Sequence, residues 1–271
     1  MKTVLAPVDF SDTSRNALFF AAELCKRSFA RLIVVNALQD DSQEEKARGE
    51  LEQIELNLKT FFGSDLRFDL SILRGNLVDS LKRIIKVERP DIIVMGTKGA
   101  SGLKRILIGS NTVNVIAKTD VPVFVIPEAA QFENFIRKGK NRVVLATDLE
   151  SLQNEDILDI LKEITLLIID PKLRVLSVRR KRSTLPYLKN MERDALLSVF
   201  TPEIESERST VFGSNVIGGV NYYLKTHKDT GLLAMIARDT GNLMQKHYTR
   251  EMASHIDLPL LVLHDGKRLI S

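Results

Sequence analysis

A glycine-rich segment in the first half of the chain carries residue types suited to phosphate binding. After the apolar run DIIVM at 91–95, the sequence places in order Gly96, Gly99, Gly109 and Ser110. Glycine lets a backbone turn tightly and approach a ligand without a Cβ atom in the way. A helix N-terminus, expected at Ser110, offers free N–H groups and a positive dipole end to an anion. The segment therefore predicts a phosphate site, where the Ser110 hydroxyl donates and Lys98 adds positive charge.

The spacing of these glycines separates the phosphate site from better-known nucleotide motifs. The pattern GxxxxGK[ST] is absent, so the segment is not a P-loop, and the absence of GxGxxG disfavours a dinucleotide site. A glycine-rich turn without any ligand stays an alternative on composition alone. Asp9 is the second candidate residue, because it lies at the end of the first apolar strand, at the edge where a ligand would lie. The alternative for Asp9 is a simple cap or turn former.

Strands and helices must alternate along the first half to position these residues. Short apolar runs predict strands at 3–10, 31–38, 66–73, 91–96 and 121–127. Helical patterns lie between them, at 11–29, 42–62, 76–88 and 111–120. Ser11 or Asp12 is expected to cap the first helix, and Pro90 to stop the third. Buried strands separated by helices predict right-handed crossovers and a parallel sheet, with a ligand crevice at the carboxyl ends of the strands.

The second half repeats this order of elements. RVVLATDL at 142–149 matches TVLAPVDF at 3–10, which puts Asp148 where Asp9 stands, and LPLLVLH matches VPVFVIP, with Pro259 over Pro122. The sequence therefore predicts an internal duplication of roughly 135 residues. The boundary is expected in a polar segment around Gly139, which gives domains at 1–138 and 139–271.

Composition and charge limit the classes of function. The chain has 271 residues, of which 44% are hydrophobic and 27% charged, so it is expected to form ordinary globular cores. No apolar run reaches the roughly 18 residues of a membrane helix, and the N-terminus lacks a signal-peptide pattern. A single cysteine, Cys25, lies in an apolar helical pattern and predicts a packed thiol in a reducing cytoplasm. A net charge of +4 is weak support for a nucleic-acid partner, so neither nucleic acid nor membrane is expected.

The pattern Gly96-x2-Gly99-x9-Gly109-Ser110 resembles the nucleotide-binding signature of the universal stress protein family. LAPVDFSDTSRNAL at 5–18 and the stretch 91–127 also resemble that family, and the likeness extends more weakly over the second half. The resemblance implies an α/β fold with two tandem doubly wound domains of the adenine nucleotide alpha hydrolase type. Each domain would hold a five-stranded parallel sheet, in the order 3-2-1-4-5, flanked by helices. Members with the full signature bind ATP.

Carried over residue by residue, the resemblance implies a set of ATP contacts in the first domain. The strand ends would contribute Pro7, Val8, Asp9, Ala37, Met95 and Gly96. The glycine segment and the helix after it would contribute Lys98, Gly99, Gly109, Ser110, Asn111 and Thr112. Asn36 stands where many relatives have histidine, which makes the contact from the second strand a departure from the family pattern. Mg²⁺ or Mn²⁺ is expected to be carried by the nucleotide rather than by a metal site of the protein.

The same segment in the second domain has lost this pattern. When the halves are aligned by Met95 and Met235, Ile236 replaces Gly96 and Asp239 falls at Gly99. About three residues are then missing from the second half, and Lys246-His247 replaces Gly109-Ser110. A branched side chain blocks close backbone approach, and an aspartate repels phosphate. We therefore expect that the second domain does not bind ATP in the same way, although Asp148 leaves room for another ligand.

Three functions from different classes remain after this reading. The first is an ATP-binding stress-response protein that signals through its conformation or through an unidentified protein partner, without fast chemistry. The second is a slow ATPase, with Asp9 orienting water or metal. The third is a nucleotide-independent scaffold, which the complete glycine pattern argues against. The strands at 121–127 and 258–264 are expected to pair within the chain as a pseudo-dimer, and a homodimer is a further possibility.

Overall fold

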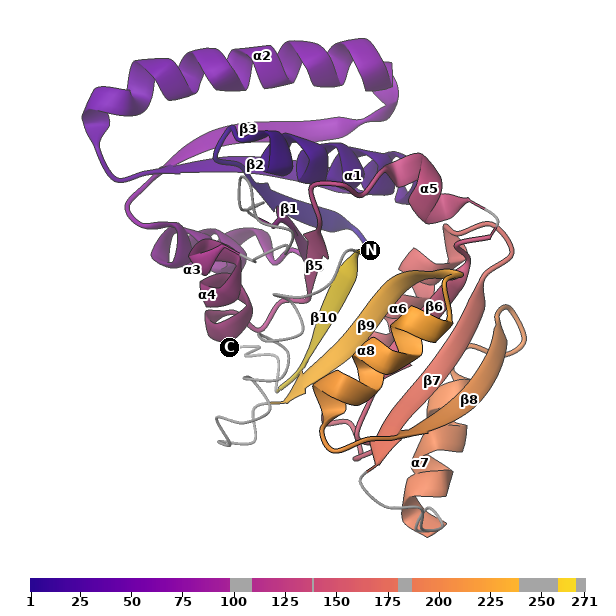
Figure 1. The fold of residues 1–271 in the computed structure, drawn as a ribbon. Coiled ribbons are helices and arrows are strands. Elements are labelled where there is room, and N and C mark those ends of the chain that lie inside the picture. The colour runs from indigo at the N-terminus through magenta and orange to yellow at the C-terminus, as the bar shows by residue number, and fades with distance from the viewer. Residues whose placement is uncertain (98–108, 138, 180–186, 239–257, 267–271) are drawn as a thin grey trace. The chain divides into compact units, whose positions relative to one another are not determined.

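The computed structural model describes residues 1–97, 109–137, 139–179, 187–238 and 258–266. The chain divides into two compact units (Figure 1). The first unit covers Met1–Phe132 and the second covers Glu133–Ser271. This division lies slightly before the one expected at 138/139. A short helix, α5 (Phe132–Ile136), spans the division. Each unit is described by itself below.

The first unit alternates strands and helices as the sequence predicts. Its strands are β1 (Thr3–Pro7), β2 (Arg31–Leu38), β3 (Arg67–Arg74), β4 (Ile92–Gly96) and β5 (Val123–Ile126). Its helices are α1 (Asp12–Ser28), α2 (Glu44–Phe62), α3 (Leu77–Glu88) and α4 (Ser110–Lys118). All paired strands are parallel, in the order β3-β2-β1-β4-β5, which confirms the expected 3-2-1-4-5 sheet.

Helices cover both faces of this sheet. α1 packs on β1 and β4 and also contacts α2, whereas α3 and α4 contact each other; Figure 1 shows these two pairs apart. On the α1 face, Phe20 meets the ring of Phe124 edge-on at 6.5 Å and that of Phe132 at 5.3 Å. Cys25 is buried in the same helix, and burial raises the pKa of its thiol to about 12. The thiol is therefore packed, as the sequence predicts, and poorly suited to nucleophilic chemistry.

The second unit repeats the alternation of parallel strands and helices, with strands and helices of different lengths. Its strands are β6 (Arg142–Ala146), β7 (Lys172–Arg179), β8 (Glu205–Phe212), β9 (Thr230–Arg238) and β10 (Leu260–Asp265). Its helices, among the residues described, are α6 (Asp156–Leu166), α7 (Tyr187–Ser198) and α8 (Val216–Thr226). The strands are parallel in the order β8-β7-β6-β9-β10, which is the order of the first unit.

The point where the strand order reverses fixes where a ligand could bind in each unit. In the first unit this switch point lies between the parallel strands β1 and β4, because β1 is followed by β2 on one side of it and β4 by β5 on the other. In the second unit it lies between β6 and β9. Ligands of open α/β sheets bind at the carboxyl ends of the strands at such a point. The residues that follow β1, β4, β6 and β9 are therefore the ones that matter for function.

Candidate functional site

Asp9 lies just past the end of β1, in a turn built around its own carboxylate. Its Oδ1 accepts hydrogen bonds from the Ser11 amide at 3.1 Å and the Ser11 hydroxyl at 2.5 Å. Phe10 adopts the left-handed region at φ 65°, which this turn requires. Partial burial raises the pKa of Asp9, but hydrogen bonds from Ser11 and Ser14 outweigh it and hold the pKa below its ordinary 3.8. A charged carboxylate is therefore fixed at the switch point.

Gly96 ends β4 where the strand comes close to the first turn of α1. A Cβ atom at this position would lie 2.6 Å from the backbone oxygen of Thr13 and 2.7 Å from its Cγ2. The carbonyl of Gly96 accepts a hydrogen bond from the Thr112 hydroxyl at 2.9 Å, which ties the start of α4 to the end of β4. Gly96 therefore allows two helices to converge on the switch point.

The N-terminus of α4 has no side-chain cap. Gly109 is its N-cap residue, in extended geometry at φ −60° and ψ 149°, and contributes no side-chain hydrogen bond. In the same unit, Ser11 caps α1 and Asn76 caps α3 through their side chains, whereas α2, like α4, has no side-chain cap. The first N–H groups of a helix lack partners within it, and no side chain among the described residues caps those of α4. An anion at this position would satisfy them.

Two buried polar atoms near this edge have no partner among the residues that the structure describes. Asn36, near the end of β2, donates through Nδ2 to the Val8 carbonyl at 2.8 Å, and its Oδ1 is unpaired. Thr97, which follows Gly96 and is 2% exposed, leaves its Oγ1 unpaired. An unsatisfied buried polar atom costs about 1–3 kcal/mol, so a ligand that supplied partners would recover part of this cost.

The other predicted contact residues take the following places. Pro7 ends β1, and Met95 is buried in β4 opposite Val125, while Ala37 is half-buried next to Asn36 in β2. Ser110 and Asn111 are exposed in the first turn of α4, whereas Thr112 is 3% exposed and its hydroxyl is bound to Gly96. Lys98 and Gly99 lie outside the described residues. The structure thus gathers the ends of β1, β2 and β4 and the start of α4 at one edge.

Neither a protein-bound metal centre nor a membrane segment is found in the described part of the chain. No group of three or more His, Cys, Asp or Glu side chains there could hold a metal ion. None of the helices described there combines the length and apolarity needed to cross a membrane.

The second unit preserves the turn after its first strand. Asp148 accepts a hydrogen bond from the Glu150 amide at 3.2 Å, and Leu149 adopts φ 59°, which repeats the geometry of Asp9 and Phe10. The following loop differs, because α1 begins three residues after Asp9 and α6 begins eight residues after Asp148. Ile236 takes the place of Gly96, so a helix cannot pack there as closely as α1 does.

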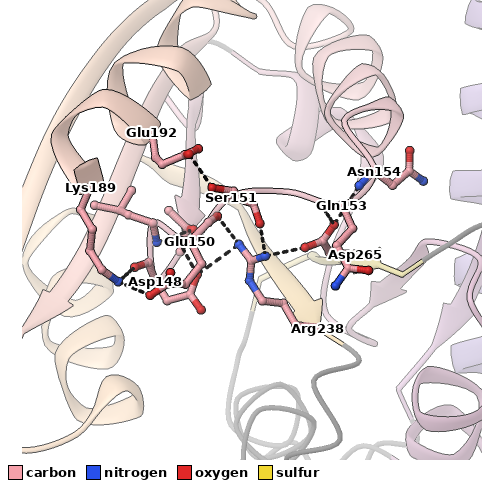
Figure 2. A network of polar contacts seen from close by, with 11 residues as sticks. Asp148, Glu150, Ser151, Gln153, Asn154, Lys189, Glu192, Arg238 and Asp265 are labelled. Carbon is pink, nitrogen blue, oxygen red and sulfur yellow. Dashed lines mark hydrogen bonds and ion pairs between the residues drawn. The ribbon is translucent and has the colours of Figure 1, made fainter. Parts of the chain in front are cut away.

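The longer loop is held by Arg238, the last residue of β9, which is 6% exposed (Figure 2). Its Nη1 donates to the carbonyl oxygen of Ser151 at 2.7 Å and to Asp265 Oδ2 at 2.5 Å. Its Nη2 donates to the Glu150 carbonyl at 2.5 Å and lies 3.3 Å from Asp148 Oδ1. When the halves are aligned by their methionines, Arg238 occupies the position of Lys98. The alignment could therefore have found Arg238, whereas no pattern pointed to Asp265.

The remaining predictions for the second unit fall largely on residues that the structure does not describe. Asp239, Lys246 and His247 all lie outside the described residues, so the loss of the glycine pattern is seen in the structure only at Ile236. The described end of the second crevice nevertheless differs from the first in charge. It carries a buried arginine and several carboxylates, whereas the first crevice presents a helix N-terminus without a side-chain cap.

Comparison with known proteins identifies relatives of the first half of the chain. The model of the universal stress protein family matches residues 1–127. A universal stress protein of Methanocaldococcus jannaschii is 31% identical over 157 residues, covering 46% of this chain and 94% of the relative. One from Thermus aquaticus is 29% identical over 135 residues, covering 46% of this chain and 98% of the relative.

A solved structure extends the likeness in fold to both halves. The crystal structure of a universal stress protein from Archaeoglobus fulgidus superimposes with a TM-score of 0.74 at 20% identity, covering 97% of this chain and 98% of that one. The 31% identity to the Methanocaldococcus jannaschii relative, 94% of which is covered, together with the family match, shows that the chain belongs to the universal stress protein family.

Proposed function

We propose that the first unit binds ATP at the carboxyl edge of its sheet and that the chain is a regulatory protein of the stress response. On this proposal, residues 1–138 form the domain with the complete nucleotide motif, and residues 139–271 form its degenerate copy. Bound ATP favours one conformation and so changes the interaction with a protein partner. The observation that carries the proposal is the uncapped N-terminus of α4, tied by Thr112 to Gly96 at the switch point.

The phosphates would lie against the first turn of α4. Ser110 and Asn111 are exposed there and offer backbone N–H groups together with polar side chains. Thr112 contributes through its backbone, because its hydroxyl is already engaged by Gly96. Lys98 and Gly99 complete the phosphate site from the glycine segment. The dipole of α4 adds positive potential at the point where the phosphates carry their negative charge.

The nucleoside would lie over the ends of β1 and β2. Val8 and Ala37 flank this position, and Asp9 offers a carboxylate to the ribose hydroxyls or to a divalent ion carried by the phosphates. The low pKa of Asp9 keeps this carboxylate charged at neutral pH. Mg²⁺ or Mn²⁺ would be carried by the nucleotide phosphates, and the Asp9 carboxylate would be its one ligand from the protein.

The experiment that tests this proposal measures the nucleotide content of the full-length protein. Freshly purified chain is heat-denatured, and released nucleotides are identified by chromatography and mass spectrometry, with ATP-Mg²⁺ titration followed by calorimetry. One adenine nucleotide per chain is expected. Gly109→Val should abolish binding, because extended geometry at position 109 tolerates valine while the side chain occupies the phosphate position.

A matched glycine substitution provides the control. Gly49→Ala changes an exposed position of α2 with nothing within 4 Å of the added methyl group, so it should bind ATP as the wild type does. Two nucleotides per chain would show that the second unit also binds. No released nucleotide and no heat of binding would refute the proposal.

A further inference from the structure

We propose that the guanidinium of Arg238 fills the ligand position at the switch point of the second unit. It lies where a bound molecule would otherwise lie. Arg238 ends β9, and Asp148 follows β6, so the pair joins the two strands between which the order reverses. The inference concerns residues 133–271 and does not depend on nucleotide binding in the first unit.

The contacts of Arg238 resemble those of a ligand because they gather separate segments around one group. The two terminal nitrogens reach the loop after β6 at the carbonyls of Glu150 and Ser151, and they reach the end of β10 at Asp265 (Figure 2). A planar guanidinium suits this arrangement, because it presents several donors in fixed directions to carbonyl and carboxylate oxygens. One side chain therefore closes the edge of the unit.

Asp265 extends this organisation to the backbone of the loop. It is 0% exposed, and its Oδ1 accepts hydrogen bonds from the amides of Gln153 at 2.7 Å and Asn154 at 3.1 Å. Its Oδ2 is paired with Arg238 at 2.5 Å. A buried carboxylate is tolerated when a cation and hydrogen bonds compensate it, and Asp265 has both. The conformation of the loop at residues 150–154 thus depends on the positive charge of Arg238.

The same groups make the described end of the second crevice unfavourable for phosphate. The carboxylates of Asp148, Glu150 and Asp265 gather around Arg238 and Lys189, with Lys189 2.5 Å from Glu150. Among the described residues of this network, carboxylates outnumber cations, so a polyphosphate at this end of the crevice would have to displace the guanidinium and then face carboxylates that have lost this cation. The described end of this crevice therefore suits a guanidinium cation better than a polyphosphate.

Removal and replacement of the guanidinium test this assignment in the full-length chain. In Arg238→Ala, hydrogen exchange at the amides of Gln153 and Asn154 should rise by about 100-fold or more, because the buried Asp265 loses its cation. Added methylguanidinium at millimolar concentration should restore protection in a saturable manner. Methylammonium at the same concentration should not, because it lacks the planar set of donors.

Arg142→Ala is the matched control, since Arg142 pairs with Asp229 at the start of β6 and lies away from the switch point. It should leave exchange at Gln153 unchanged and should not respond to methylguanidinium. Unchanged exchange in Arg238→Ala, or exchange that methylguanidinium does not restore, would overturn the assignment.

A variant that fails to fold is also informative. All four tyrosines lie in the second half, so tyrosine emission reports its unfolding. If Arg238→Ala leaves this unit unfolded, the double variant Arg238→Ala with Asp265→Asn, which removes both charges, should recover folding. A double variant as unfolded as the single one would contradict the role given to the pair.

Discussion

Substitution of Gly96 by alanine tests how closely β4 and α1 approach at the proposed nucleotide site. The added Cβ atom would lie 2.6 Å from Thr13 O and 2.9 Å from Thr13 C, both backbone atoms. Neither can move without shifting the first turn of α1 or the end of β4. Overpacking of this kind costs about 1–3 kcal/mol. Alanine also restricts the unfolded chain, which returns about 0.4–1 kcal/mol. We expect a net loss of about 1–2 kcal/mol in the free energy of unfolding.

Amide hydrogen exchange is the appropriate assay, because the first half of the chain has neither tyrosine nor tryptophan to report its unfolding. Peptides from β1 and β4 should exchange roughly 5- to 30-fold faster in Gly96→Ala if they open through global unfolding of the unit. The midpoint of thermal unfolding should fall by roughly 4 °C for each kcal/mol. ATP binding should weaken as well, since the same shift displaces α4 through Thr112.

Gly49→Ala is the same chemical change in a place where nothing opposes it. Gly49 lies inside α2, is exposed, and has no atom within 4 Å of an added Cβ. Because alanine has the higher helix propensity, it should stabilise the unit by about 0.5–1 kcal/mol. The two variants should therefore shift stability in opposite directions. Thr13→Ser should not rescue Gly96→Ala, because the closest contact is to the backbone. Equal stability of Gly96→Ala and wild type would refute the close packing described.

Two further predictions concern titratable groups. Asp9→Asn should lower stability at pH 7, and the difference from wild type should shrink as pH falls below 3.8 through the depressed pKa of Asp9, as thermal scans across pH would show. A difference that persisted unchanged at pH 2 would contradict the role of the charge. Cys25 should react with a thiol reagent at pH 8 only after denaturation, because its pKa of about 12 and its burial suppress the thiolate; rapid reaction of the native protein would show that the helix is not packed as described.

The sequence predicts the fold well where the signal is periodic and local. β2 has the limits expected for residues 31–38, and Ser11, one of two candidate caps, is the one that caps α1. The segment ESERSTVF at 205–212 lacks an apolar run, so its sequence does not predict a strand. It forms β8 at the end of the sheet order, where all of its residues stay exposed or half-buried and polar side chains are tolerated.

The candidate site is less predictable, since its geometry depends on residues far apart in sequence. The glycine pattern predicts a close approach at Gly96, but only the fold shows that Thr13 is the group that approaches. In the second half, the loss of glycine at Ile236 predicts the loss of an ATP site. It does not predict that Arg238 and Asp265 meet there, because their pairing depends on the register of β9 and β10.

The burial of Cys25 makes the native chain behave as a cysteine-free background for chemical labelling. A cysteine introduced at an exposed position would be the single reactive thiol, so a probe could be attached there without removing any natural residue. Ser110→Cys would place that thiol in the first turn of α4. Its rate of alkylation would then report directly on whether a bound molecule covers the start of this helix, in a mixture where neither radioactive nucleotide nor a separation step is needed.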